Sequence, residues 1–203
     1  MKKFLILGIC VLCVSCGSHR QSVGDDASAD QIANRNGACD DQIAYRNGGA
    51  EEFYQQGNRY AQGKGVEKNY AIAAGCYRRA AEMGNSNAQD KLGVRYMLGQ
   101  GVPQDLDIAR DWFEKAAAQG NPYAENELGY MYAAGKGVGQ DYVTAIQWYQ
   151  KASDHGLASA QYNLGLMYAN GIGTPVDKVK AKALFTLAAA RGFGPAKKAL
   201  AQV

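Results

Sequence analysis

The chain has 203 residues, of which 47% are hydrophobic and 20% are charged, so it is neither wholly disordered nor composed like a polytopic membrane protein. Its formal net charge is +3 and it contains no basic block, which disfavours binding to nucleic acid. The two histidines, His19 and His155, exclude a site that needs three imidazoles and disfavour a histidine-based catalytic triad.

The N-terminus has the pattern of a secretion signal. Lys2 and Lys3 precede an apolar run over residues 4–14, which is much shorter than the about 20 residues that span a membrane. A charged start followed by a short apolar run is typical of a signal peptide. The sequence therefore predicts a signal peptide over residues 1–15 and a polar, flexible tether over residues 16–29.

Residues 12–17, LCVSCG, resemble a bacterial lipobox, in which a lipidated cysteine becomes the mature N-terminus. The resemblance implies acyl chains on Cys16, and more than one chain gives stable anchoring. Cys13 departs from the pattern, because an aliphatic residue is usual there. Ordinary signal-peptidase cleavage after Ser15 is the alternative. Gly17 follows the cysteine, which by the same resemblance implies an outer-membrane lipoprotein of the bacterial envelope that faces the periplasm or the cell surface.

A short internal repeat lies between this tether and the rest of the chain. The segment DQIANRNG at residues 30–37 returns 11 residues later as DQIAYRNG at residues 41–48. We interpret residues 30–49 as a short helical lead-in that covers the first unit of the domain that follows.

A repeat of 36 residues dominates residues 50–203. Eight columns of glycine, alanine or tyrosine recur in four successive units, and a fixed period of this length indicates a solenoid of stacked units. Two of the columns are Gly57, Gly93, Gly129 and Gly165, and Tyr60, Tyr96, Tyr132 and Tyr168.

Each unit has the pattern of two helices joined by a glycine turn. In the second unit the first helix is predicted over residues 87–98 and ends at Gly99, because glycine tolerates the left-handed backbone of a helix stop. Asp105 is a suitable N-cap for the second helix, which is predicted to run to about Gln119 and to end at Gly120. Gly93 in mid-helix costs about 1 kcal/mol of helix propensity, so we expect it to admit a closely packed neighbouring helix.

The predicted fold is an all-α, right-handed solenoid of about four helix-turn-helix units with a concave and a convex side. The pattern resembles the Sel-one-like repeat family, which is related to the tetratricopeptide repeat. The resemblance covers about residues 50–203 and is carried by Leu92-Gly93-x-x-Tyr96, Gly99-x-Gly101-Val102 and Ala109-x-x-Trp112-Phe113-x-Lys115-Ala116-Ala117, which recur with small changes in the third unit.

The two ends of the array depart from this pattern. Gln56 and Cys76 replace the usual leucine and tryptophan in the first unit, so we expect a terminal unit with one side less buried. Residues 194–203 match the first helix of a fifth unit that is cut short, with Lys197 and Lys198 on its outer face.

If Cys16 carries lipid, Cys39 and Cys76 remain after processing, in an oxidising compartment. We expect a disulfide between them that fixes the lead-in to the second helix of the first unit. Two unpaired thiols, with Cys76 filling a small core position, are the alternative. The sequence has no recognisable catalytic or metal-ligating motif, so no cofactor and no metal ion are expected. His155, at the end of a second helix, is expected to interact with the helix dipole.

In related repeats the first helix of each unit lines the concave surface, so the resemblance implies a binding face there. This face mixes tyrosines, aliphatic residues and amides and is expected to carry few charges; tyrosine is enriched where proteins contact one another. The predicted partner-binding residues are Tyr54, Asn58, Asp90, Val94, Met97, Tyr123, Asn126, Tyr130, Tyr162 and Leu166.

These features predict a non-enzymatic protein-protein interaction module, anchored to the membrane only through its N-terminal lipid, that binds a protein partner in its concave groove. By the family resemblance, one alternative is an immunity protein that neutralises a secreted antibacterial toxin such as a phospholipase. A β-lactam-binding or hydrolysing enzyme is another alternative. It is disfavoured because the chain lacks regular cysteine pairs and a nucleophile–base pair.

Overall fold

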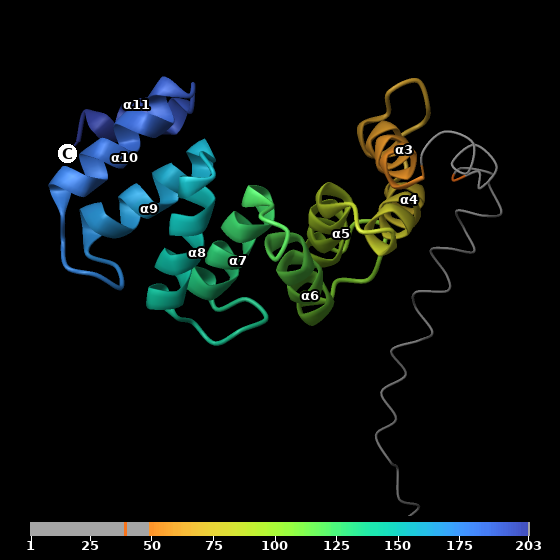
Figure 1. Ribbon diagram of the computed structural model, residues 1–203, viewed down its shortest axis with the longest axis horizontal. Coiled ribbons are helices and arrows are strands. Elements are labelled where there is room, and N and C mark those ends of the chain that lie inside the picture. Colours follow the sequence, from red (N-terminus) through yellow and green to blue (C-terminus); the bar gives the residue numbers. More distant parts are fainter. Residues whose placement is uncertain (1–38, 40–48, 203) are drawn as a thin grey trace, which may run out of the picture.

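The computed structural model describes residues 39 and 49–202, and helices are the regular elements in this part of the chain (Figure 1). The predicted signal peptide, the predicted tether with Cys16, and the predicted lead-in apart from Cys39 and Gly49 lie outside the described residues. No described helix is both long and apolar enough to cross a membrane. The helices are α3 (Ala50–Gln62), α4 (Tyr70–Glu82), α5 (Ser86–Leu98), α6 (Leu106–Ala117), α7 (Pro122–Ala134), α8 (Tyr142–Asp154), α9 (Ala158–Asn170), α10 (Lys178–Ala190) and α11 (Gly194–Leu200).

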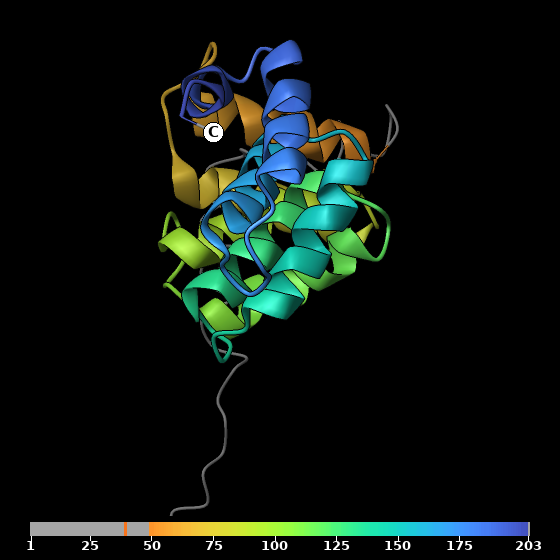
Figure 2. The same ribbon diagram turned by 90° about the vertical axis from the view of Figure 1, so that its left-hand side faces the viewer.

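Consecutive helices pair and the pairs stack into a bent array, which Figure 2 shows from one end. Within a repeat the first helix packs on the second, as α5 does on α6, and each second helix packs on the first helix of the next repeat. The predicted all-α solenoid is therefore confirmed. α11 packs on α10 in the position that the first helix of a further unit would take, with Ala196 buried and Lys197 and Lys198 exposed.

The helix boundaries follow from the capping residues. Asp105 accepts hydrogen bonds from the N–H groups of Asp107 and Ile108 at the start of α6, and α5 ends at Gly99 in the left-handed conformation, with φ of 63°, as predicted. The prediction that α6 continues to about Gln119 is wrong. The helix ends at Ala117, because the chain turns there and the N–H of Gly120 bonds to the Ala117 carbonyl oxygen at 2.9 Å.

The mid-helix glycines allow an aromatic ring of the paired helix to lie on the first helix. A Cβ atom at Gly93 would lie 2.7 Å from a ring carbon of Phe113, which is fully buried. Tyr77, Tyr149 and Phe185 lie in the same way on Gly57, Gly129 and Gly165. The predicted close packing is therefore confirmed, and it accounts for the glycine column despite the cost in helix propensity.

A second glycine column holds neighbouring repeats together. Gly101 has a φ of 79°, and a Cβ atom there would overlap the backbone of Tyr70 in the preceding repeat. Gly137 and Gly173 make the same approach to the preceding second helix. Among the described residues no repeat precedes Gly65, and the nearest atom there is the side-chain Nη2 of Arg59 at 4.0 Å.

The first repeat joins the array through its second helix, α4. Its two helices differ in depth: α4 packs between α3 and α5 and buries Cys76, Tyr77 and Arg78, whereas the outer helix α3 buries only Phe53, Gln56 and Gly57. The structure joins Cys76 to Cys39 by a disulfide with a Cα–Cα distance of 5.7 Å, and Cys39 is itself buried in the core. The disulfide therefore fixes Cys39 to the second helix of the first repeat, as predicted.

Candidate functional site

The ten predicted contact residues lie on the first helices α3, α5, α7 and α9, and we call this surface the first-helix face. The structure places them at different depths. Tyr123 and Tyr130 of α7 are 53% and 37% exposed, whereas Asp90 is only 2% exposed. The other seven are half-buried: Tyr54, Asn58, Val94, Met97, Asn126, Tyr162 and Leu166.

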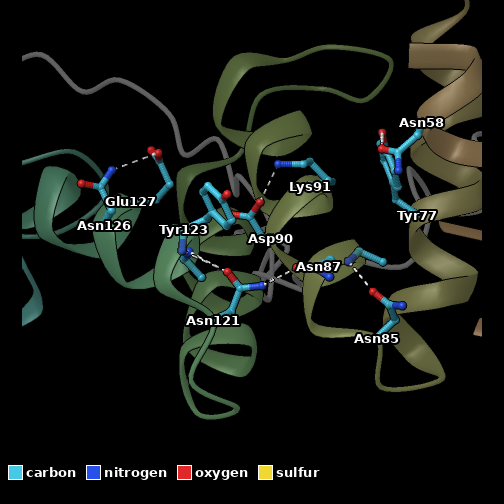
Figure 3. Close-up of polar contacts among 12 residues, drawn as sticks. Asn58, Tyr77, Asn85, Asn87, Asp90, Lys91, Asn121, Tyr123, Asn126 and Glu127 are labelled. Carbon is cyan, nitrogen blue, oxygen red and sulfur yellow. Dashed lines mark hydrogen bonds and ion pairs between the residues drawn. The ribbon is translucent and has the colours of Figure 1, made fainter. Parts of the chain in front are cut away.

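Several of the half-buried residues have packing roles within the array. Val94 and Met97 pack against the core. The ring of Tyr162 lies 5.7 Å from that of Phe185, centroid to centroid. Asn58 Oδ1 accepts a hydrogen bond from the Tyr77 hydroxyl at 2.9 Å (Figure 3). These half-buried side chains therefore support the first-helix face by packing beneath it. Among the ten predicted contact residues, Tyr123 and Tyr130 are the most exposed tyrosines.

Polar side chains connect adjacent first helices across the face. Asn163 Nδ2 on α9 donates a hydrogen bond to Asn126 Oδ1 on α7 at 3.0 Å. One repeat earlier, 36 residues back, the positions of this amide pair are held by Asp90 and Glu127. Two carboxyl groups thus stand on α5 and α7 where two amides bond to each other in the next interface.

Asp90 lies beneath longer side chains at the centre of the face. Lys91 Nζ donates to Asp90 Oδ2 at 3.0 Å, and Lys91 Nζ also lies 5.4 Å from the centroid of the Tyr123 ring. Asp90 Oδ1 is buried and has no hydrogen-bond partner among the described residues. Burial raises the pKa of Asp90, an effect that the adjacent Lys91 opposes.

Glu127 is half-buried on α7 and weakly bonded. Asn126 Nδ2 donates to Glu127 Oε1 at 3.5 Å, a long contact (Figure 3). Burial raises the pKa of Glu127, and the charge of Asp90 raises it further. We call Asp90, Lys91, Tyr123 and Glu127 the acidic site, because the ammonium of Lys91 pairs with Asp90 and the charges of Asp90 and Lys91 both act on Glu127.

Lys91 and Glu127 are absent from the predicted contact residues, and the expectation of few charges on this face overlooked them. The signal that could have found them is the repeat itself. Their column contains Gln55, Lys91, Glu127 and Asn163, and the column before it contains Tyr54, Asp90, Asn126 and Tyr162. Both columns change in charge from repeat to repeat.

The described residues show no group of three histidine, cysteine or acidic side chains that could hold a metal ion. His155 caps the C-terminus of α8, in the place expected from the sequence. Its Nδ1 lies 2.8 Å from Oε2 of Glu125, which is buried on α7. This contact ties the two helices of the third repeat together.

Comparisons with known proteins agree with this architecture. The family model described as Sel1 repeat matches residues 54–85, 86–121, 122–157 and 158–193. A Sel1 repeat protein from Oxalobacter formigenes, whose crystal structure is known, is 32% identical with a TM-score of 0.73, over 87% of this chain and 74% of that one.

Two further solved structures are similar. The protein c5321 of uropathogenic Escherichia coli, described as a protective antigen with an SLR fold, is 31% identical with a TM-score of 0.70, over 86% of this chain and 40% of that one. The immunity protein Pa5087 of Pseudomonas aeruginosa shares 22% identity with a TM-score of 0.56, over 85% of this chain and 68% of that one, a likeness in fold alone. A comparison with curated proteins gives no match.

Proposed function

The chain belongs to the Sel1 repeat family, and we propose that it is a non-enzymatic module that binds a protein partner on its first-helix face. Sel1 repeats are in general scaffolds for protein interaction. The observation that carries the proposal is the pair of exposed tyrosines on α7, Tyr123 and Tyr130, beside a polar site in the middle of the array. A tyrosine offers a large contact area together with a hydroxyl group, and is enriched at binding hot spots.

Replacement of Tyr130 by alanine is expected to weaken capture of the partner from a bacterial envelope extract by about tenfold or more, the effect of losing a hot-spot side chain. Tyr142 provides a matched control, because it is 38% exposed, against 37% for Tyr130, but lies on the second helix α8. Tyr162→Ala is expected to have a smaller effect on capture, since its ring packs on Phe185. The measurement is quantitative mass spectrometry of the captured proteins.

Two results would contradict this assignment. Equal capture by wild type and Tyr130→Ala would place the contact elsewhere, and equal loss with Tyr142→Ala would show that the first-helix face has no special role. Neutralisation of a secreted toxin is one form that such binding could take, and the captured partner would identify it. Saturable hydrolysis of a β-lactam by the purified protein would contradict the non-enzymatic part of the proposal.

We further propose that the mature protein is held at the bacterial outer membrane by lipid on Cys16. The support is the signal-like start and the lipobox resemblance at residues 12–17. Cells grown with radiolabelled palmitate are expected to yield labelled wild-type protein, and the label is expected to be absent from Cys16→Ser. A labelled Cys16→Ser protein would place the acyl chain on another residue, and an unlabelled wild type of processed length would favour ordinary cleavage after Ser15.

A further inference from the structure

The Asp90–Glu127 interface differs in chemistry from the interface that follows it. Asn126 and Asn163 satisfy each other, because an amide side chain has both a donor and an acceptor. Ionised carboxylates only accept hydrogen bonds, so Asp90 and Glu127 cannot bond to each other when both are charged. This interface therefore needs donors from elsewhere.

The donors within the described residues satisfy the site only in part. Lys91 donates a hydrogen bond to Oδ2 of Asp90, whereas Oδ1 of Asp90 is buried without a partner among the described residues. Glu127 receives only the 3.5 Å contact from Asn126. Two carboxylates and one ammonium give the site a net charge of −1, and buried polar atoms of native proteins are nearly always bonded. The site thus has acceptors and negative charge to offer to a cation.

An aromatic surface stands beside these acceptors. The Tyr123 ring is 53% exposed and already lies near the Lys91 ammonium, with 5.4 Å between the nitrogen and the ring centroid (Figure 3). Lys91 is about one third exposed, with 35% of its side chain accessible, so it can move aside. A guanidinium group combines several donors with a planar face that stacks on aromatic rings, and its charge suits a carboxylate pair.

On the basis of the proposed function, we infer that the acidic site receives an arginine side chain of the protein partner. The guanidinium donates to Asp90 and Glu127 and stacks on Tyr123, while Lys91 turns toward solvent. The partner is thereby specified in part: it presents an arginine within a surface that also contacts Tyr130. The carboxylate pair sets the specificity, and the exposed tyrosines supply contact area.

The inference can be tested without knowing the partner, by selecting a displayed random-peptide library on the immobilised full-length protein. Peptides whose binding falls with Tyr130→Ala are retained, because these contact the first-helix face. We expect the retained peptides to share an arginine at one position. Replacement of that arginine by citrulline, which has the same shape without the charge, is expected to weaken binding at least tenfold.

The decisive comparison uses the variant Asp90→Asn/Glu127→Gln, which brings the site close to the amide pair of the next interface. We expect it to bind the arginine peptide at least tenfold more weakly than wild type and to bind the citrulline peptide as well as wild type does. Asp111→Asn/Glu114→Gln is the control, since it removes the same charge from exposed positions on α6, and it is expected to retain binding. Equal melting temperatures of the variants exclude a folding defect.

Different failures have different meanings. If Tyr130-dependent peptides bind equally with arginine or citrulline, or equally to wild type and to Asp90→Asn/Glu127→Gln, the arginine assignment is overturned while the proposed function stands. If no selected peptide depends on Tyr130, the proposed function and the inference that rests on it are both overturned.

Discussion

Replacement of Gly101 by alanine is expected to lower the free energy of unfolding by about 2–5 kcal/mol, for two reasons that add. The backbone at Gly101 is left-handed, with φ of 79°, a conformation that costs other residues roughly 1–2 kcal/mol. In addition, the new Cβ atom would overlap the Tyr70 backbone of the preceding repeat. Backbone atoms at the start of α4 cannot turn away as a side chain can, so the two repeats must move apart. Urea unfolding followed by circular dichroism measures the change.

Gly65→Ala separates the two contributions. Gly65 occupies the same position in the first repeat and has a similar φ of 72°, but its nearest atom is the flexible end of Arg59 at 4.0 Å. We expect this variant to lose only the conformational part, roughly 1–2 kcal/mol. Equal losses in Gly65→Ala and Gly101→Ala would mean that the contact between repeats contributes nothing to stability.

Loss of the Cys39–Cys76 disulfide is expected to lower the free energy of unfolding by about 4 kcal/mol. The bond closes a loop over a sequence separation of 37 residues, and the chain-entropy model gives a cost of that order for a loop of this length. Thermal unfolding of the purified protein with and without dithiothreitol measures the effect, and peptide mapping after alkylation reports on the two thiols. Cys39→Ser/Cys76→Ala is the control, because its melting temperature should not respond to the reductant.

The opposite outcome would restore the alternative of two unpaired thiols. Alkylation of Cys39 and Cys76 in denatured protein that has not been reduced would show that no bond exists. A melting temperature unchanged by reduction, in protein whose disulfide is demonstrated by mapping, would show that the loop is already constrained in the unfolded chain.

Most of the architecture could be predicted from the sequence because each structural requirement recurs at 36-residue intervals. The Phe113 ring requires a glycine at position 93, and the start of α6 requires a capping residue such as Asp105. Both requirements are local, and they can be recognised because they recur in each repeat. The position of Cys39 in the core could not be read from the columns, because Cys39 lies outside the repeat.

The sequence predicts the acidic site only in part, for a related reason. It places Asp90 on the first-helix face, but the burial of Asp90 and its relation to Glu127 depend on how adjacent first helices are placed against each other. The column pattern gives the residue type at each position and not the neighbour across the interface. The Asn126–Asn163 hydrogen bond in the structure shows which positions of adjacent first helices are neighbours, and these positions correspond to Asp90 and Glu127 one repeat earlier.

The contact between Gly101 and the Tyr70 backbone shows that the residues that fix the stacking of repeats differ from the exposed residues proposed to contact a partner. Successive repeats contact each other at this glycine column through main-chain atoms. The bend of the array therefore depends on positions where a side chain larger than that of glycine does not fit. The exposed tyrosines Tyr123 and Tyr130 take no part in that contact. Substitutions at exposed positions of single repeats can therefore change the binding specificity while the shape of the array stays the same.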